Sequence, residues 1–478
     1  MATIKKNLSY NLALTFCGYI FPLLTYPYVS RVLGVTNIGI CNFVDSIINY
    51  FVLFSALGIT SLGVREIAKV KDDKQKCSEV FSTLVFINAA LSVIMTIGLV
   101  IACYTIDKFM TYRPFLFVGI SKLLLNTYVI EWFYQGISNF KYITIRSFII
   151  RCIYTVNVFA FVHSTNDTLI YYGLSCVTTV FNAGINWHYA HRFVSFSWKK
   201  IRIPAYIASV VSYGTYRILT SLYTSFNITY LGFVSGDKEV GYYTTATKLY
   251  TIIISVITAL TTVMIPKVSE LISKDDNESL KSMAEKTFQM VFTFAIPLVV
   301  VCNMCSPLII RIIAGTGYDG AVVPFRIITT LLLIVGMEQI IIQQFLMAKR
   351  DNKCILILSF AGACIGLLLN ITLTPSMASI GSAISWTASE LAILILSLYY
   401  FKKHFAMTLP YNTLIKELLL SIPYILICTF IYDVHSNLKI TITFSLCLVW
   451  FCISNVIIYP KETIILPIKN LKRRFNKS

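Results

Sequence analysis

Long apolar segments alternate with short polar ones along the whole 478-residue chain. About 20 apolar residues suffice for a helix to cross the ~30 Å hydrocarbon core of a bilayer. Segments of that length are predicted at residues 10–30, 39–63, 81–103, 112–134, 143–162, 168–190, 208–233, 240–265, 287–309, 321–347, 354–374, 378–400, 414–432 and 439–459. The pattern therefore predicts an all-α polytopic membrane protein with about 14 transmembrane helices.

The two halves of this pattern resemble each other. Residues 39–73 and 241–276 each begin at a glycine, continue as one long apolar segment, and reach a cation before a Lys-Asp-Asp loop. That cation is Arg65 in the first copy and Lys267 in the second. Because each predicted copy holds an even number of spans, about six, both copies have the same orientation in the membrane. We therefore predict a parallel repeat, related by an axis along the membrane normal.

The repeat divides the chain into three predicted parts. Residues 1–203 form an N-terminal six-helix lobe, and residues 204–405 form a C-terminal six-helix lobe. Residues 406–478 supply two extra transmembrane helices and a basic cytoplasmic tail. Paired lobes are a common plan for alternating access, in which a substrate is held between the lobes. This organisation predicts a transporter with a central cavity.

Composition supports the membrane assignment and argues against binding of nucleic acid. Hydrophobic residues make up 56% of the chain and charged residues only 13%, about half the usual charged share of a soluble protein. The net charge of +18 comes mostly from cations in loops that face one side once the N-terminus is placed inside. The positive-inside rule fits that orientation, so both termini are predicted to be cytoplasmic. The excess charge is a signal of topology.

The sequence offers little support for enzyme chemistry. No segment outside the spans is long enough for a soluble catalytic domain, and no catalytic-triad, zinc or phosphate-loop spacing occurs. Gly315, Gly317 and Gly320 follow a dinucleotide-loop pattern, but the strand, turn and helix that such a loop requires are not predicted there. Cys302 and Cys305 have redox spacing, but in an apolar helix they behave as small packing residues. We expect no enzyme activity, no metal and no cofactor.

Cations inside the predicted spans are the main functional signal. A charge at the membrane centre costs about 2.5–3.5 kcal/mol, so it needs a cavity or a partner. Arg151 and Glu131 lie near the inner interface and are expected to snorkel toward water. Arg326 and Lys122 have structural pairing, or reach to an interface, as an alternative. A cationic substrate-binding cavity is predicted from five side chains, one of them at the outer end of the first span: Arg31, Arg217, Lys248, Arg326 and Lys122.

Acids and aromatic rings complete the predicted site. Asp45, Glu338 and Glu390 lie inside spans and are candidates for ion coupling, although Glu338 and Glu390 would equally suit buried hydrogen-bonded pairs. The cavity candidates carry more positive than negative charge, which favours an anionic ligand. Arginine matches phosphate geometry with paired donors, so a phosphate or diphosphate head group is predicted. Sugar faces could stack on nearby aromatic rings: Tyr26, Tyr28, Tyr216, Tyr223 and Trp132.

Three passages resemble those of a known family. They are the pattern P-x-x-x-R-x-L-G-x-x-x-x-G at residues 27–39, EWFYQGISNFKYITIRS at residues 131–147, and VGYYTTATKLY at residues 240–250. The chain resembles the Wzx-type polysaccharide flippases, the polysaccharide transporter branch of the multidrug/oligosaccharidyl-lipid/polysaccharide exporter superfamily. Arg31 also resembles the cavity arginine of lipid II flippases in that superfamily, although leucine replaces the aromatic residue of their pattern.

The resemblance implies both a fold and an activity. The fold would have two six-helix lobes plus two further helices around a V-shaped cavity. The activity would move undecaprenyl-diphosphate-linked oligosaccharides, such as O-antigen or capsule units, from the inner to the outer leaflet of the bacterial cytoplasmic membrane. Implied partners are membrane lipids, H⁺ or Na⁺ as coupling ion, and polysaccharide polymerase and chain-length regulator proteins.

Two alternative functions belong to other classes. A drug or organic-cation antiporter of the same superfamily would require an acidic cavity. A membrane polysaccharide polymerase or ligase would usually require a sizeable outer loop to carry its reactive groups, whereas the outer loops predicted here are short. The cationic residues and the short loops therefore favour the flippase.

Overall fold

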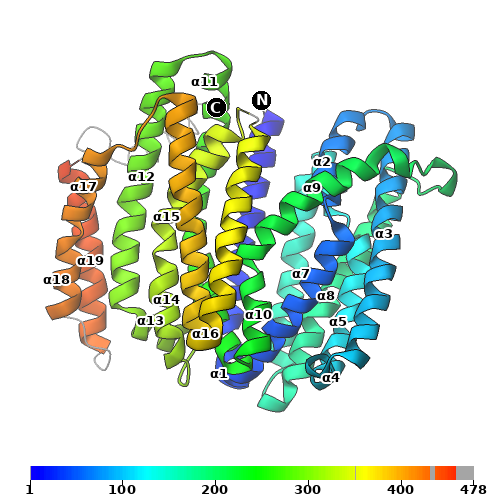
Figure 1. Cartoon of the computed structure of the whole chain (residues 1–478), viewed down its shortest axis with the longest axis horizontal. Coiled ribbons are helices and arrows are strands. Elements are labelled where there is room, and N and C mark those ends of the chain that lie inside the picture. The colour runs from blue at the N-terminus through cyan, green and yellow to red at the C-terminus, as the bar shows by residue number, and fades with distance from the viewer. Residues whose placement is uncertain (1, 350, 431–436, 459–478) are drawn as a thin grey trace. The chain divides into compact units, whose positions relative to one another are not determined.

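The computed structural model describes residues 2–349, 351–430 and 437–458, and every regular element in them is helical (Figure 1). The prediction of an all-α membrane protein is thereby confirmed. The predicted basic tail beyond residue 458 lies outside the described residues.

Eleven helical segments among the described residues are long and apolar enough to cross a membrane. Two of them, Ala13–Ala56 and Lys353–Phe405, have 44 and 53 residues and each covers two predicted spans. Both break near their middle, at Gly34 with φ 75° and at Ala378 with φ 49°. Glycine adopts a positive φ without the steric cost that a Cβ imposes. Gly34 therefore explains how one continuous run of apolar residues yields two differently directed helices.

The chain forms two compact units. Unit 1 comprises Met1–Thr245, Ile313–Ala321 and Gly362–Trp386. Unit 2 comprises Ala246–Ile312, Val322–Ala361 and Thr387–Ser478. The predicted lobes at 1–203 and 204–405, with the extra part at 406–478, remain a prediction.

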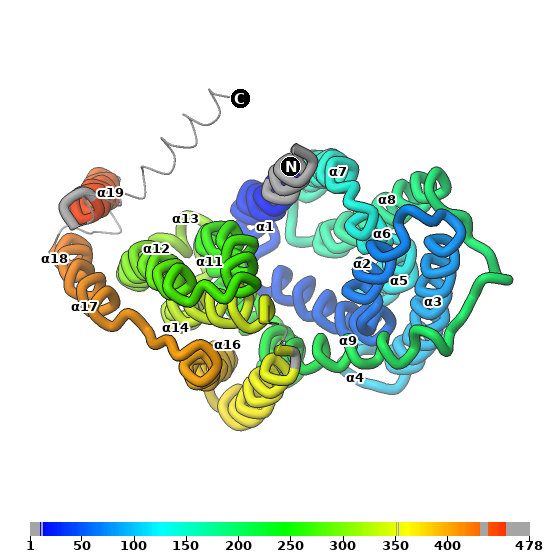
Figure 2. The backbone as a smooth tube through the Cα atoms, turned by 90° about the horizontal axis from the view of Figure 1, so that it is seen from above, coloured from blue at the N-terminus to red at the C-terminus, as the bar shows by residue number. Residues whose placement is uncertain are grey.

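Unit 1 is built mainly from the N-terminal helices. Its elements are α1 (Ala2–Ala56), α2 (Ile59–Val70), α3 (Lys74–Thr105), α4 (Asp107–Thr111), α5 (Arg113–Leu125), α6 (Glu131–Gly136), α7 (Phe140–Phe161), α8 (Thr168–Ala190), α9 (Ile203–Thr224), α10 (Phe226–Val234) and the first turns of α11 (Asp237–Ser273). Figure 2 shows α2, α3, α5, α6, α7 and α8 gathered together, and buried side chains of α2, α3, α6, α7 and α8 belong to one hydrophobic core.

That core is rich in aromatic rings from the short helix α6. Phe133 and Tyr134 of α6 are fully buried, and Phe133 meets Phe81 of α3 edge to face. Gly63 of α2 allows Trp132 to pack closely, because a Cβ at Gly63 would lie 2.3 Å from the indole ring. The EWFYQG passage therefore anchors α6 between α2 and α3.

A second close contact joins α1 to the start of α11. A Cβ on Gly39 would lie 1.8 Å from the carbonyl oxygen of Asp237, and one on Gly241 would lie 2.2 Å from that of Val35. Small residues allow helix backbones to approach closely in membrane proteins. The two glycines that begin the predicted repeat copies thus lie at one helix–helix contact.

Unit 2 contains the later helices. Its elements are the rest of α11, α12 (Asn277–Met304), α13 (Ser306–Ile313), α14 (Val322–Thr329), α15 (Leu331–Glu338), a π-helix (Gln339–Leu346), the two ends of α16 (Asn352–Phe405), α17 (Tyr411–Leu420), α18 (Ile422–Phe430) and α19 (Asn437–Ile458). The buried side chains of Phe288, Phe345 and Phe401 join α12, the π-helix and α16 in its core.

Candidate functional site

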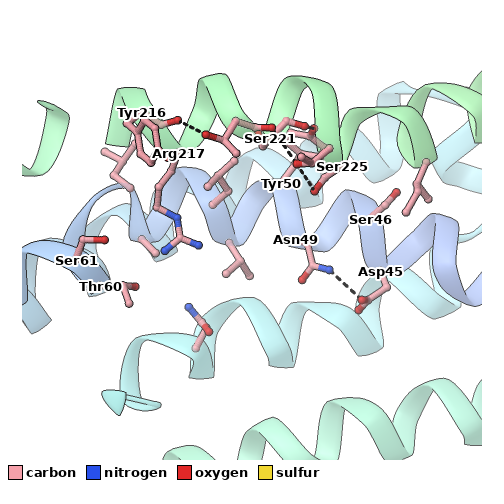
Figure 3. A pocket seen from close by; sticks show the side chains of 18 of the residues that line it. Asp45, Ser46, Asn49, Tyr50, Thr60, Ser61, Tyr216, Arg217, Ser221 and Ser225 are labelled. Atoms are coloured by element: carbon pink, nitrogen blue, oxygen red, sulfur yellow. Dashed lines mark hydrogen bonds between the residues drawn. The ribbon is translucent and has the colours of Figure 1, made fainter. Parts of the chain in front are cut away.

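A large cavity lies in unit 1 and has a volume of about 750 Å³. The second half of α1, the start of α2, and α9 with the start of α10 form its walls (Figure 3). The side chains that line it are predominantly polar: Asn42, Asp45, Ser46, Asn49, Tyr50, Thr60, Ser61, Asn126, Tyr216, Arg217, Thr220, Ser221, Thr224 and Ser225, together with Val52, Leu53, Ala56, Leu57 and Ile228.

Local backbone geometry brings these walls together. After α1 ends, Leu57 has φ 38° and Gly58 begins the turn into α2. A Cβ on Gly58 would lie 2.3 Å from the Cβ of Tyr213 and 2.6 Å from the carbonyl oxygen of Val210. Only glycine permits this approach of the turn to α9. Thr60 of α2 is thereby held beside the wall that α9 supplies.

Hydrogen bonds fasten α1 to α9 and α10 along the cavity. The Tyr50 hydroxyl donates to the carbonyl oxygen of Ser221 at 3.0 Å, and the Thr229 hydroxyl donates to Ser46 Oγ at 2.9 Å. Hydrogen bonds between side chains and backbone therefore hold the helices of the cavity wall together.

Asp45, an acidic residue that lines the cavity, forms an ion pair with Lys122. Lys122 Nζ of α5 lies 2.5 Å from Asp45 Oδ1, and Asn49 Nδ2 donates to Asp45 Oδ2 at 2.9 Å. Charge-assisted hydrogen bonds of this kind are short and strong. Asp45 and Lys122 therefore contribute little net charge to the cavity.

Arg217 gives the cavity its net positive charge. Its side chain extends from α9 into the space between α9 and α1 (Figure 3) and is exposed. Among the described residues, no carboxylate lies within ion-pair distance of its guanidinium group, and no hydrogen bond is assigned to it. An accessible guanidinium group without a carboxylate partner can bind an anion with paired donors.

Other predicted cavity cations lie elsewhere. Arg31 does not line this cavity: its guanidinium group donates to the carbonyl oxygen of Pro27 at 2.8 Å, and its side chain packs against Gly315. Lys248 and Arg326 belong to unit 2, where Arg326 Nε donates to Ser306 Oγ at 2.8 Å. Their predicted role in substrate binding remains a prediction.

Glu338 and Glu390 meet each other inside unit 2. Their exposed fractions are 6% and 7%, and their carboxyl groups are close enough to interact electrostatically. The Tyr250 phenol is close enough to interact electrostatically with both carboxyl groups. Glu338 ends α15 where the π-helix begins, and π-helical turns occur frequently at functional sites.

Asn42 and Asn49, which line the cavity, were missed at the level of sequence, whereas Ser46 beside Asp45 was expected there. Asn42, Ser46 and Asn49 recur every three or four positions, which places them on one face of α1. That polar stripe in an apolar helix was a detectable signal. Among the rings proposed for sugar stacking, Tyr216 lines the cavity, whereas Trp132 is buried in the core of unit 1.

Comparison with known families gives a match over more than half of the chain. The family model described as "Polysaccharide biosynthesis protein" matches residues 4–272. A curated protein of Escherichia coli (strain K12), named putative O-antigen transporter, is 24% identical over 84% of this chain and 97% of its own length. A Shigella dysenteriae protein of the same name is 21% identical over 83% of this chain and 99% of its own length.

Solved structures show which fold the chain shares. The lipid II flippase MurJ, in an inward closed conformation, has a TM-score of 0.80 at 14% identity, with 95% of this chain and 99% of that chain covered. A multidrug resistance MATE family transporter in an outward-facing conformation has a TM-score of 0.59 at 13% identity, with 85% and 95% covered. These likenesses concern the fold.

Proposed function

Because the chain belongs to the polysaccharide biosynthesis protein family, we propose that it is a lipid-linked oligosaccharide flippase. It moves undecaprenyl-diphosphate-linked repeat units from the inner to the outer leaflet of the bacterial cytoplasmic membrane by alternating access. The names of the two curated relatives and the likeness to the fold of a lipid II flippase support this proposal. The observation that carries it is the accessible Arg217 in a large polar cavity.

The cavity addresses the main barrier to flipping, which is the charge of the head group. Ionised phosphate in hydrocarbon would lose its hydration without compensation, at a cost of many kcal/mol. Arg217 offers paired donors to a phosphate, while Asn49, Thr220 and Ser221 offer the neutral hydrogen-bonding groups that sugars require. A volume of about 750 Å³ lies within the usual range for pockets that hold a small ligand. The polyprenyl tail would remain in the lipid.

No covalent bond needs to be made or broken in this cycle. The protein would lower the barrier only by replacing water with fixed dipoles and one fixed cation. Asp45, in this proposal, holds Lys122 and limits the local field, because its carboxylate is occupied by that partner.

Energy coupling is proposed for the buried carboxyl pair of unit 2, with a proton as the coupled ion. Two carboxyl groups in contact and away from water cannot both ionise without a large penalty, so they share a proton. Glu338 and Glu390 meet those conditions. Exposure of the pair to water during the cycle would release the proton, and renewed burial would require its return.

The chain is proposed to lie in the membrane with both termini in the cytoplasm. In that orientation the substrate enters Arg217's cavity from the side where lipid-linked units are assembled. The product leaves in the outer leaflet, where a polysaccharide polymerase and a chain-length regulator would receive it. A drug or organic-cation antiporter is less well supported, because a cavity with an uncompensated guanidinium group repels cations.

A reconstituted flipping assay tests the proposal. Purified protein in liposomes would receive an undecaprenyl-diphosphate oligosaccharide, and a membrane-impermeant glycosidase would report how much reaches the outer leaflet. Arg217→Gln should slow transfer about 10- to 100-fold, as expected for loss of a charge-assisted contact. Arg311→Gln, which removes an exposed arginine of unit 2, should leave the rate unchanged. Wild-type protein that transfers no substrate, while an active reference flippase does, would refute the proposal.

A further inference from the structure

The EWFYQGISNFKYITIRS passage contains residues that the Arg217 cavity does not use. Its second half passes through a turn into the first two turns of α7. Two hollows on the surface of unit 1 lie along this part of the chain, and Asn139 lines both of them. The two hollows are therefore adjacent.

The first hollow is an apolar groove of about 430 Å³ on α7 and α8. Ile145, Ile149 and Ile185 line it, and their exposed fractions are 46%, 50% and 43%. Both helices are long and apolar enough to span the membrane, so we expect these exposed side chains to face hydrocarbon. A groove of this kind fits a single acyl chain, which would fill it with methylene groups.

The second hollow is basic and has a volume of about 620 Å³. Lys71, Lys74 and Arg192 line it with one acid, Asp72, and all three cations are exposed. Lys141, at the end of the apolar groove, adds a fourth cation. The charge pattern of the sequence places all four cations on the predicted cytoplasmic side.

The junction between the hollows is ordered. Tyr142 and Tyr189 stack with ring centroids 4.1 Å apart, and the guanidinium carbon of Arg192 lies 5.2 Å from the centroid of Tyr189. Asn139 caps α7 by accepting from the backbone N–H of Tyr142 at 3.4 Å. The positive end of the α7 dipole therefore also lies at the junction.

We propose that this basic hollow and apolar groove form a binding site for one anionic phospholipid of the inner leaflet. The phosphate contacts Lys71, Lys74 and Arg192, while one acyl chain lies over Ile145, Ile149 and Ile185. Basic pockets on the cytoplasmic side of transmembrane helices recognise anionic head groups in this way. The inference rests on membrane insertion and predicted orientation, and it holds whether or not the chain is a flippase.

A resident phospholipid fits better here than the transported substrate. The groove is lined by residues of α7 and α8, whereas the Arg217 cavity is lined by α1, α2, α9 and α10. The two sites share no lining residue. A polyprenyl tail in the groove would therefore not place its diphosphate in the cavity.

Spin-labelled phosphatidylglycerol provides the test, with protein reconstituted in bilayers of phosphatidylethanolamine. Lys71→Gln/Lys74→Gln/Arg192→Gln should lower the affinity for the labelled anionic lipid at least about tenfold. The matched variant Lys281→Gln/Lys402→Gln/Lys403→Gln, which removes three exposed cations of unit 2, should bind as wild type. Ile149→Trp and Ile185→Trp, which fill the groove from opposite walls, should each weaken binding of anionic and neutral labelled lipid alike.

Three results would overturn the inference. The first is unchanged phosphatidylglycerol binding by the Lys71/Lys74/Arg192 variant, and the second is an equal loss in the unit 2 control, which would indicate a general charge effect. The third is displacement of the labelled lipid by undecaprenyl diphosphate at equal concentration, which would assign the groove to substrate. Thermal unfolding of each variant near the wild-type temperature would show that the change concerns binding.

Discussion

The Arg217 cavity of unit 1 and the Glu338–Glu390 pair of unit 2 carry opposite charges in opposite surroundings. Arg217 is exposed to a cavity of about 750 Å³. The two glutamates are only 6% and 7% exposed and are close enough to interact electrostatically. A hydrated guanidinium group can exchange water for a phosphate at little cost. Buried carboxyl groups instead shed charge by retaining a proton. This difference supports the proposal that the accessible charge binds the ligand and that the buried pair binds the proton.

The Asp45–Lys122 ion pair is intermediate in exposure between Arg217 and the two glutamates. Its side chains are 34% and 23% exposed, so water screens the pair only in part. The pair borders the same cavity as Arg217, yet it presents no net charge. The charge that a side chain presents to a ligand therefore depends on its ion-pair partner as well as on its exposure.

Charge reversal at Arg217 is expected to have the largest effect on the rate of substrate transfer. Arg217→Glu would place a carboxylate where the substrate diphosphate is proposed to bind, so transfer should fall more than about 100-fold. Arg217→Lys keeps the charge but loses the paired donors, and should retain part of the activity. The flipping assay measures both rates. Normal transfer by Arg217→Glu would remove Arg217 from the mechanism.

Neutralisation of the buried pair Glu338 and Glu390 should have the second-largest effect on the transfer rate. Glu338→Gln/Glu390→Gln preserves side-chain volume and hydrogen bonding but cannot release a proton. An imposed pH gradient should then no longer accelerate transfer, and the rate under that gradient should fall about tenfold, within the usual range of coupling energies. Transfer is measured with and without the gradient. A double variant that still responds to the gradient would show that protons are coupled elsewhere.

The fold class was readable from sequence, because the cost of exposing backbone and charge to hydrocarbon acts on every span. The long apolar segments specify helices whatever their partners are. The two breaks within long helices were also readable, because the predicted spans 10–30 and 39–63 separate around Gly34, and the predicted spans 354–374 and 378–400 separate close to Ala378. Gly34 is a recognisable hinge, and Pro375 lies three residues before Ala378.

The candidate site was predictable only in part. The apolar surroundings of Arg217 marked it as a cavity residue before any contact was known. The ion pair of Lys122 with Asp45 joins positions 77 residues apart, and no local pattern specifies which charges meet across that distance. Arg31 was grouped with the cavity cations because it lies at the outer end of the first predicted span, and in the structure its side chain packs against Gly315. Tertiary packing, which the local sequence does not specify, determines where these charged side chains lie.

Loss of the cavity's neutral ion pair should have a moderate effect that a second substitution reverses. Lys122→Met leaves the Asp45 carboxylate without its cation, so its charge opposes the substrate phosphate. Transfer should fall about fivefold, equivalent to ~1 kcal/mol for a partly exposed pair. Lys122→Met/Asp45→Asn removes both charges and should recover most of the rate, a coupling that a double-mutant cycle quantifies. Equal losses in the single and double variants would instead indicate damaged packing.

Removal of one hydrogen bond at the cavity wall should give the smallest effect. Tyr50→Phe deletes the hydroxyl that donates to the Ser221 carbonyl at 3.0 Å and changes no charge. We expect the free energy of unfolding to drop by about 1 kcal/mol, as is typical of one hydrogen bond, with transfer nearly unchanged. Thermal denaturation and the flipping assay, run on the same preparation, separate the two quantities. A loss of transfer as large as that of Arg217→Gln would mean that wall geometry, and not the accessible cation, governs substrate binding.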